Sequence, residues 1–143
     1  SGDMYPKGGN LLHMIRQIIN NDSTFRTILR GMNKTWYHKT VTTKDVEAYM
    51  SQQSGIDLSK VFDQYLRTTQ IPVLEYSIKG KDLKFRFTNC IKGFGMPVKV
   101  KWGNEEKWIR ANEEWTIISG NANTSNFSVD KNFYINSKKV DWQ

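Results

Sequence analysis

The stretch TTQIPVLEYSIK, residues 68–79, decides the fold, because the spacing of apolar residues changes within it. Before this stretch, apolar residues recur every three or four positions, as on one face of a helix; after it, they alternate with polar residues, as in a strand. Pro72 cannot continue a helix, since it lacks a backbone N–H and its ring clashes with the preceding turn. We therefore predict an α+β chain, with a helical part at residues 1–70 and a β part at residues 71–143.

Residues that start and stop helices divide the helical part into about four helices. Starts are predicted at Pro6, Asp22, Thr42 (with Asp45 completing a capping box) and Asp57. Stops are predicted at Asn20-Asn21, where asparagine tolerates a left-handed conformation, and at Ser54-Gly55. The last helix carries one apolar face with the spacing of an amphipathic helix: Leu58, Val61, Phe62, Tyr65 and Leu66.

The β part reads as about seven short strands that form a small antiparallel β-sandwich. Its clearest strands alternate apolar and polar residues at 74–79, 83–87 and 98–102, and Trp102 shares the apolar face of the last of these. Gly103-Asn104 predicts a two-residue hairpin with glycine first. Further strands are predicted around Trp108, Trp115 with Ile117, Phe127 with Val129, and Phe133 with Ile135.

The composition excludes some functions. The net charge is +7, but the basic residues are dispersed, and Lys138-Lys139 is the densest spot, so we predict a solvated basic surface and no nucleic-acid partner. No apolar run approaches the roughly 20 residues that a membrane span needs. Cys90 is the single cysteine, and we expect it to be a small apolar residue on a strand.

Most catalytic motifs are absent from the sequence. It has no H-E-x-x-H and no C-x-x-C pattern, and His13 and His38 lack a carboxylate at the spacing of metal ligands. We therefore predict no metal-binding residue within these 143 residues.

The segment Tyr5-Pro6-Lys7-Gly8-Gly9 is the one place that breaks a local rule, because a helix should not open with two glycines. Such a pair predicts the close approach of a ligand or of another backbone. A residue before proline is pushed toward an extended conformation, so we expect Tyr5 to stand just ahead of the helix, beside its free amides. A phenol there can donate a hydrogen bond to an oxygen that becomes negative. A tyrosine that simply packs at a helix start is the other interpretation.

Several segments together resemble the aminopeptidase N-like family of zinc metallopeptidases, the gluzincins. The resemblance covers residues 4–78, in order and at similar spacing, and rests on YPKGGNLLHMIR (5–16), VTTKDV (41–46), SGIDL (54–58), FDQYL (62–66) and IPVL (71–74). Two positions depart from the family pattern: Pro6 stands where a charged residue is more common, and Gly9 where alanine is common.

The resemblance implies that this chain is a fragment: the end of a metallopeptidase catalytic domain followed by a β-sandwich domain. It implies a zinc cofactor held by residues upstream, a peptide substrate that loses its N-terminal residue, and the upstream catalytic domain as a partner. Tyr5 would be the catalytic residue, donating its hydroxyl to the tetrahedral intermediate. The fragment alone is then expected to bind no zinc and to be inactive.

Two alternatives stay open. The chain could be a non-catalytic module for carbohydrate or polyanion, since Trp102, Trp108 and Trp115 accompany a basic surface. It could also belong to a family member that has lost its zinc ligands. The sequence predicts neither the substrate-binding residues and residue preference, nor the localisation of the longer protein, nor its oligomeric state.

Overall fold

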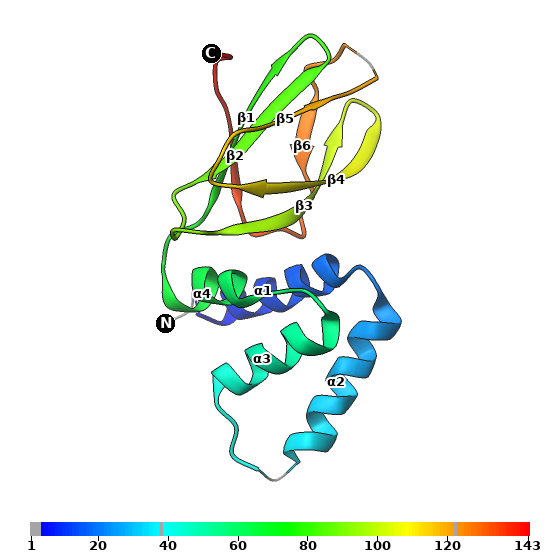
Figure 1. Cartoon of the computed structure of the whole chain (residues 1–143), viewed down its shortest axis with the longest axis vertical. Helices are drawn as coiled ribbons and strands as arrows, with labels where there is room; N and C mark the ends of the chain where they lie inside the picture. Colours follow the sequence, from blue (N-terminus) through cyan, green and yellow to red (C-terminus); the bar gives the residue numbers. More distant parts are fainter. Residues whose placement is uncertain (1–3, 38, 122) are drawn as a thin grey trace.

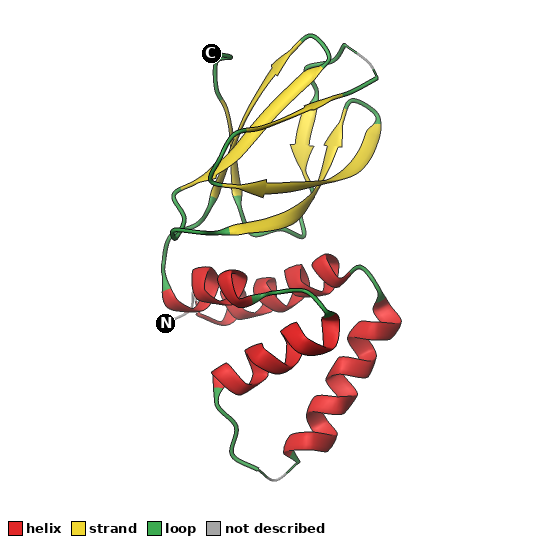
Figure 2. Cartoon of the chain, in the orientation of Figure 1, coloured by secondary structure: helices red, strands yellow, loops and turns green. Residues whose placement is uncertain are grey.

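The structure is a computed structural model that describes residues 4–37, 39–121 and 123–143; for residues 4–8 it describes the backbone only. Within these residues four helices precede seven strands, which confirms the predicted α+β order (Figure 1 and Figure 2). The helices are α1 (Met4–Ile19), α2 (Asp22–Trp36), α3 (Thr43–Ser54) and α4 (Ser59–Arg67). The strands are β1 (Val73–Lys79), β2 (Asp82–Thr88), β3 (Gly95–Trp102), β4 (Glu105–Asn112), β5 (Thr116–Ser119), β6 (Phe127–Val129) and β7 (Asn136–Lys139).

Local capping signals place several helix ends as predicted. Thr42 caps α3, and its capping box is complete: its hydroxyl accepts the Asp45 N–H, while the Asp45 carboxylate accepts the Thr42 N–H. Gly55 ends the same helix at φ 73°, and Asn20 ends α1 at φ 51°. Both residues adopt the left-handed conformation that closes a helix.

Two predicted caps were wrong. The side chain of Asn21, not Asp22, accepts the Thr24 N–H at 3.0 Å and caps α2, while Asp22 pairs with Arg16 at 3.0 Å. Helix α4 begins at Ser59 with Leu58 at its N-cap, and the Asp57 carboxylate accepts the Ser59 N–H in a local turn. At α2 the adjacent Asn21 and Asp22 side chains could both cap the helix, so the sequence could not choose between them, whereas at α4 the N-cap residue Leu58 makes no side-chain cap.

The strands form two sheets with strand orders β5-β2-β1-β7 and β4-β3-β6. All pairs are antiparallel except β1 with β7, which is parallel and departs from the predicted antiparallel arrangement. The predicted hairpin is confirmed, because Trp102 pairs with Glu105 across the two-residue turn at Gly103-Asn104. Gly103 has φ 67°, which explains the glycine.

The two sheets contribute buried residues to one core. The inward faces of β2 and β3 alternate as predicted, and supply Leu83, Phe85, Phe87, Val98, Val100 and Trp102 to it. Tyr76 of β1 and Phe127 of β6 link the two sheets, with ring centroids 4.3 Å apart.

Several predicted apolar positions lie elsewhere. Ile117 is 59% exposed, and Trp115, which is 38% exposed, lies just before β5, although the two were predicted to share a strand. Phe133 and Ile135 belong to a loop, and the last strand begins after them, at Asn136. Leu66 of α4 is also exposed. Cys90 is half-buried in the loop after β2 rather than on a strand.

Helices α1 and α4 lie next to the sheets, whereas α2 and α3 extend away from them (Figure 1). Gln64 of α4 is fully buried at this junction, and its Oε1 accepts the Ile91 N–H at 2.7 Å. The Tyr65 hydroxyl, one residue along, donates to the Tyr134 carbonyl at 2.8 Å. The core cluster runs continuously from α1 through α4 into the sheets.

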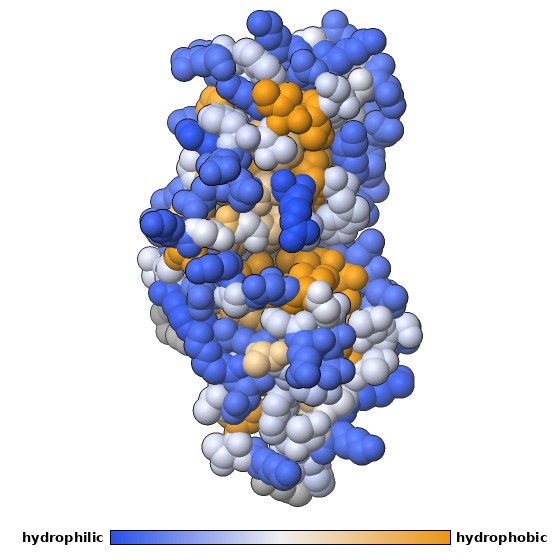
Figure 3. All heavy atoms as spheres, in the orientation of Figure 1, coloured by the Kyte–Doolittle hydropathy of each residue, from blue (hydrophilic) through white to orange (hydrophobic). Residues whose placement is uncertain are grey.

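Apolar residues also reach the surface. Figure 3 shows them gathered in one area over the sheets and in another near the junction with the helices, separated by polar atoms. Among the described residues, no helix has both the length and the apolar character needed to cross a membrane.

Candidate functional site

The structure places Tyr5 in the first turn of α1, which begins at Met4, two residues earlier than predicted. The prediction that Tyr5 stands ahead of the helix was therefore wrong for the backbone. Pro6 is tolerated there because the first four N–H groups of a helix have no partner within it. The side chain of Tyr5 lies outside the described part of the structure. Its catalytic role stays a prediction.

The surroundings of Gly9 are open. A Cβ added at Gly9 would meet nothing within 4 Å, and Gly9 and Asn10 are both exposed. At Gly9, therefore, no described residue of this chain makes the close approach that the pair of glycines predicted.

The rest of α1 packs against the core and against a loop of the β part. Its buried face contributes Leu11, Met14, Ile15 and Ile18 to the core. The Tyr134 N–H donates to the Met14 sulfur at 3.1 Å, and His13 Nε2 lies 2.5 Å from the Asn132 side-chain oxygen. Contacts with one loop of the β part therefore fix the position of α1 relative to the sheets.

The described residues contain no group of three or more His, Cys, Asp or Glu side chains placed to hold a metal ion. His13 is exposed and contacts Asn132, while His38 lies outside the described residues. Burial, followed by the charge of Glu113, raises the pKa of the Cys90 thiol to about 11. This thiol is therefore protonated at neutral pH and is a poor nucleophile.

An ionic cluster that the sequence analysis missed joins α3 to α4. Arg67 donates from both terminal nitrogens to the Glu47 carboxylate, at 2.6 and 3.1 Å, and also to Asp63 at 3.0 Å. Glu47 is only 5% exposed. The one available sequence signal was the i, i+4 spacing of Asp63 and Arg67. Since every member is paired, the cluster has a structural explanation.

A second missed feature lies on the outer face of the β5-β2-β1-β7 sheet. Lys84 is 7% exposed, and its ammonium donates to the Gln143 carbonyl at 2.9 Å and lies 4.6 Å from the Trp115 ring centroid. Arg86 lies 4.5 Å from the same ring and pairs with Glu75 at 2.9 Å. These two cations are already engaged, so they are poorly placed to bind a polyanion.

The three tryptophans proposed for a binding module do not share one surface role. Trp102 is 5% exposed, as its place on the apolar face of β3 predicted. Trp108 packs edge-on against Phe133, with centroids 5.8 Å apart. Trp115 stacks on Lys84 and Arg86. A row of aromatic rings that could stack on a nucleic-acid strand is therefore not formed by these three residues.

Comparisons with known proteins find matches among solved structures. A comparison with protein-family models finds no match, and one with curated proteins finds none either. Among solved structures, the chain is similar to Legionella pneumophila aminopeptidase A in complex with aspartic acid, with a TM-score of 0.78 and 17% sequence identity. The match covers 96% of this chain and 18% of that one.

The chain therefore shares its fold with a segment of an aminopeptidase. At 17% identity the similarity concerns the fold alone. The chain spans less than a fifth of the length of that aminopeptidase, 18% of it.

Proposed function

We propose that this chain is a segment of a larger zinc-dependent aminopeptidase, joining the end of its catalytic domain to a β domain. One observation carries the proposal: nearly the whole chain, 96% of it, matches a small part of an aminopeptidase in fold. The ordered resemblance of residues 4–78 to the gluzincin segments supports the same conclusion independently, since it was drawn from residues rather than from coordinates.

Tyr5 has a defined role in this proposal. Its hydroxyl donates a hydrogen bond to the oxygen that becomes negative when the peptide carbonyl is attacked. Its place in the first turn of α1 supports this role, because the free amides of a helix start favour negative charge. The open space at Gly9 leaves room for a substrate backbone. The core contacts of Met14 and Ile15 would limit movement of the helix that carries the phenol.

The zinc ion of the proposed enzyme has no ligand set among the described residues of this chain. Within the proposal, its ligands belong to an upstream part of the longer protein, as the family resemblance implies. The contribution proposed for this chain is limited to the phenol and the helix that positions it. The peptide substrate and the upstream catalytic domain are the partners of this proposal.

The experiment uses the longer protein that contains this chain. We expect it to hydrolyse aminoacyl-anilides and to contain zinc by elemental analysis, whereas the 143-residue chain alone has neither property. Peptides with a blocked N-terminus should resist cleavage, because an aminopeptidase removes the first residue. A chelator should abolish the activity, and added zinc should restore it.

Two results would contradict the proposal. Hydrolysis by the isolated chain would show that the catalytic groups lie within it. A longer protein that binds no zinc and cleaves no anilide would instead belong to the alternative of a family member without zinc ligands.

A further inference from the structure

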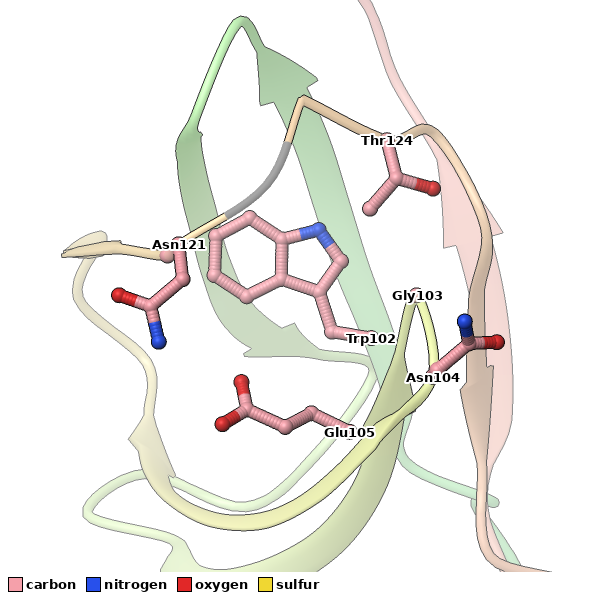
Figure 4. A pocket seen from close by; sticks show the side chains of 7 residues that line it. Trp102, Gly103, Asn104, Glu105, Asn121 and Thr124 are labelled. Carbon is pink, nitrogen blue, oxygen red and sulfur yellow. The ribbon is translucent and has the colours of Figure 1, made fainter.

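A cavity of about 300 Å³ lies between the turn of the β3–β4 hairpin and the loop from β5 to β6. This volume is at the lower end of the range of roughly 300–1,000 Å³ for small-molecule sites. In Figure 4 its polar side chains come from both segments: Asn104 and Glu105 from the hairpin, and Asn121 and Thr124 from the loop. Figure 1 places these segments at the end of the sheets far from the helices.

Backbone hydrogen bonds fix both walls of the cavity. The Gly103 N–H donates to the Asn126 carbonyl at 2.8 Å, which ties the hairpin turn to the loop. The Gly120 N–H donates to the Lys81 carbonyl at 2.7 Å, which ties the start of the loop to the β1–β2 turn. The cavity is thus formed by two anchored segments rather than by one free loop.

Glycine is required beside the aromatic wall. A Cβ at Gly120 would lie 2.7 Å from two ring carbons of Trp102, closer than such contacts allow. The indole ring therefore packs directly against bare backbone. A Cβ at Gly103 would lie 3.0 Å from the Thr124 methyl carbon, a tight contact but a less severe one.

Trp102 also carries an unused polar group. Trp102 is 5% exposed, and its indole N–H has no hydrogen-bond partner among the described residues. A buried donor without an acceptor costs about 1–3 kcal/mol, and such groups are rare. Figure 4 places the indole nitrogen on the ring edge that faces Thr124. Less than 1 Å² of this nitrogen is accessible, so an oxygen atom in the cavity would satisfy the donor once the Thr124 side chain turns aside.

The lining selects for a neutral ligand rich in hydroxyl groups. Two side-chain amides, one carboxylate and one threonine hydroxyl offer both donors and acceptors. The residues that line the cavity include no lysine or arginine, and the Glu105 carboxylate repels anions. An ammonium group is disfavoured because Lys107 already lies 5.4 Å from the Trp102 ring centroid.

We propose that this cavity binds one unit of a saccharide. A sugar oxygen accepts the Trp102 N–H, the Glu105 carboxylate accepts a sugar hydroxyl, and the Asn121 amide holds a further hydroxyl. This inference is independent of the proposed peptidase function and uses different residues.

The test is a titration of the isotope-labelled protein, followed by the NMR signals of the tryptophan indole N–H groups. The probes are glucose, galactose, mannose and N-acetylglucosamine, each raised to tens of millimolar. We expect a saturable shift of the Trp102 indole signal with at least one sugar, and no comparable shift of the signals of Trp36, Trp115 or Trp142. Trp102→Phe identifies the signal by removing it and should abolish binding.

Two variants with smaller side-chain changes test the proposal if Trp102→Phe does not fold. Glu105→Gln and Asn121→Ala should each weaken binding about tenfold, the loss expected for one hydrogen bond of ~1.4 kcal/mol. Asn123→Ala is the matched control, because Asn123 is exposed on the same loop but does not line the cavity. It should leave the affinity unchanged.

Three results would overturn the proposal. The first is the absence of a saturable Trp102 shift with all four sugars. The second is equal affinity of the wild-type protein and the Asn121→Ala and Glu105→Gln variants. The third is a Trp102 shift produced by heparin but by none of the sugars, because the site would then bind a polyanion.

Discussion

The Tyr65 hydroxyl in α4 donates a hydrogen bond to the backbone carbonyl of Tyr134, 69 residues later in the chain, at 2.8 Å. Tyr65 is 1% exposed, and burial raises the pKa of its phenol above the ordinary value, so the hydroxyl is protonated at neutral pH and serves as a donor. This bond crosses from the helices to the sheets. It therefore reports on whether the two parts stay docked.

We predict that Tyr65→Phe lowers the free energy of unfolding by about 1–3 kcal/mol, because the Tyr134 carbonyl loses its buried donor. Urea unfolding followed by circular dichroism measures the change. Tyr76→Phe is a suitable control, since its partner in the core is the Phe127 ring, and it should have a smaller effect. Equal stability of Tyr65→Phe and wild type would show that the bond contributes nothing to docking.

Gly31 makes room for a tyrosine from another helix. A Cβ at Gly31 would collide with the Tyr49 hydroxyl, and Tyr49 cannot easily move because its ring packs edge-on against Trp36, with centroids 5.1 Å apart. We predict that Gly31→Ala destabilises the protein by about 1–3 kcal/mol, although alanine favours helices.

Gly9→Ala is the matched comparison, since Gly9 is also helical but has no neighbour within 4 Å. It should stabilise the isolated chain by about 0.5–1 kcal/mol. Adding Tyr49→Phe to Gly31→Ala should recover much of the loss. If Gly31→Ala instead stabilised the chain in thermal unfolding, the close approach of Tyr49 would be disproved.

The capping box of α3 predicts a pH effect. Hydrogen bonds from the Thr42 backbone N–H, and then from its hydroxyl, hold the pKa of the Asp45 carboxyl below its ordinary value. A lowered folded-state pKa contributes stability above the unfolded-state pKa of about 3.9, and this contribution is lost as pH falls through the folded value. Stability should therefore drop more steeply below about pH 4 in wild type than in Asp45→Asn. Parallel curves of unfolding free energy against pH would contradict this assignment.

The ionic cluster between α3 and α4 predicts that Arg67→Ala alone lowers the stability more than Arg67→Ala combined with Glu47→Gln. Arg67→Ala leaves the buried Glu47 carboxylate without its bidentate partner and should cost about 2–3 kcal/mol. Adding Glu47→Gln should restore part of the loss, because the uncompensated charge is gone. Arg26→Ala on α2 is the control. Additive effects of Arg67→Ala and Glu47→Gln in urea unfolding would show that the two side chains do not interact.

The sequence predicted features that depend on neighbouring residues. The Thr42 capping box, the left-handed Gly55 and the hairpin at Gly103-Asn104 each need only a few adjacent residues, and the structure confirms them. The order of helices and then strands followed from the change in apolar spacing near Pro72.

Features that depend on distant residues were missed. Phe133 and Ile135 suggested a strand, but the loop that contains them packs on α1 through Tyr134 and Met14. Lys84 is covered by Trp115 and the Gln143 carbonyl, which no local pattern indicates.

The candidate site was predictable only in part. Residue patterns and the family resemblance singled out Tyr5, but not that α1 would begin at Met4 and include it. The cavity beside Trp102 could not be predicted, since it depends on how the loop of residues 120–126 meets a hairpin turn far away in sequence.

The proposed function rests on Tyr5, and the most direct test is the turnover of the longer protein carrying Tyr5→Phe. We predict that kcat for an aminoacyl-anilide falls about 100- to 1000-fold, the usual effect of removing one donor to a developing oxyanion, while the zinc content is unchanged. Tyr37→Phe, at the other end of the helical part, should keep the wild-type kcat. A Tyr5→Phe variant with wild-type kcat would contradict the account.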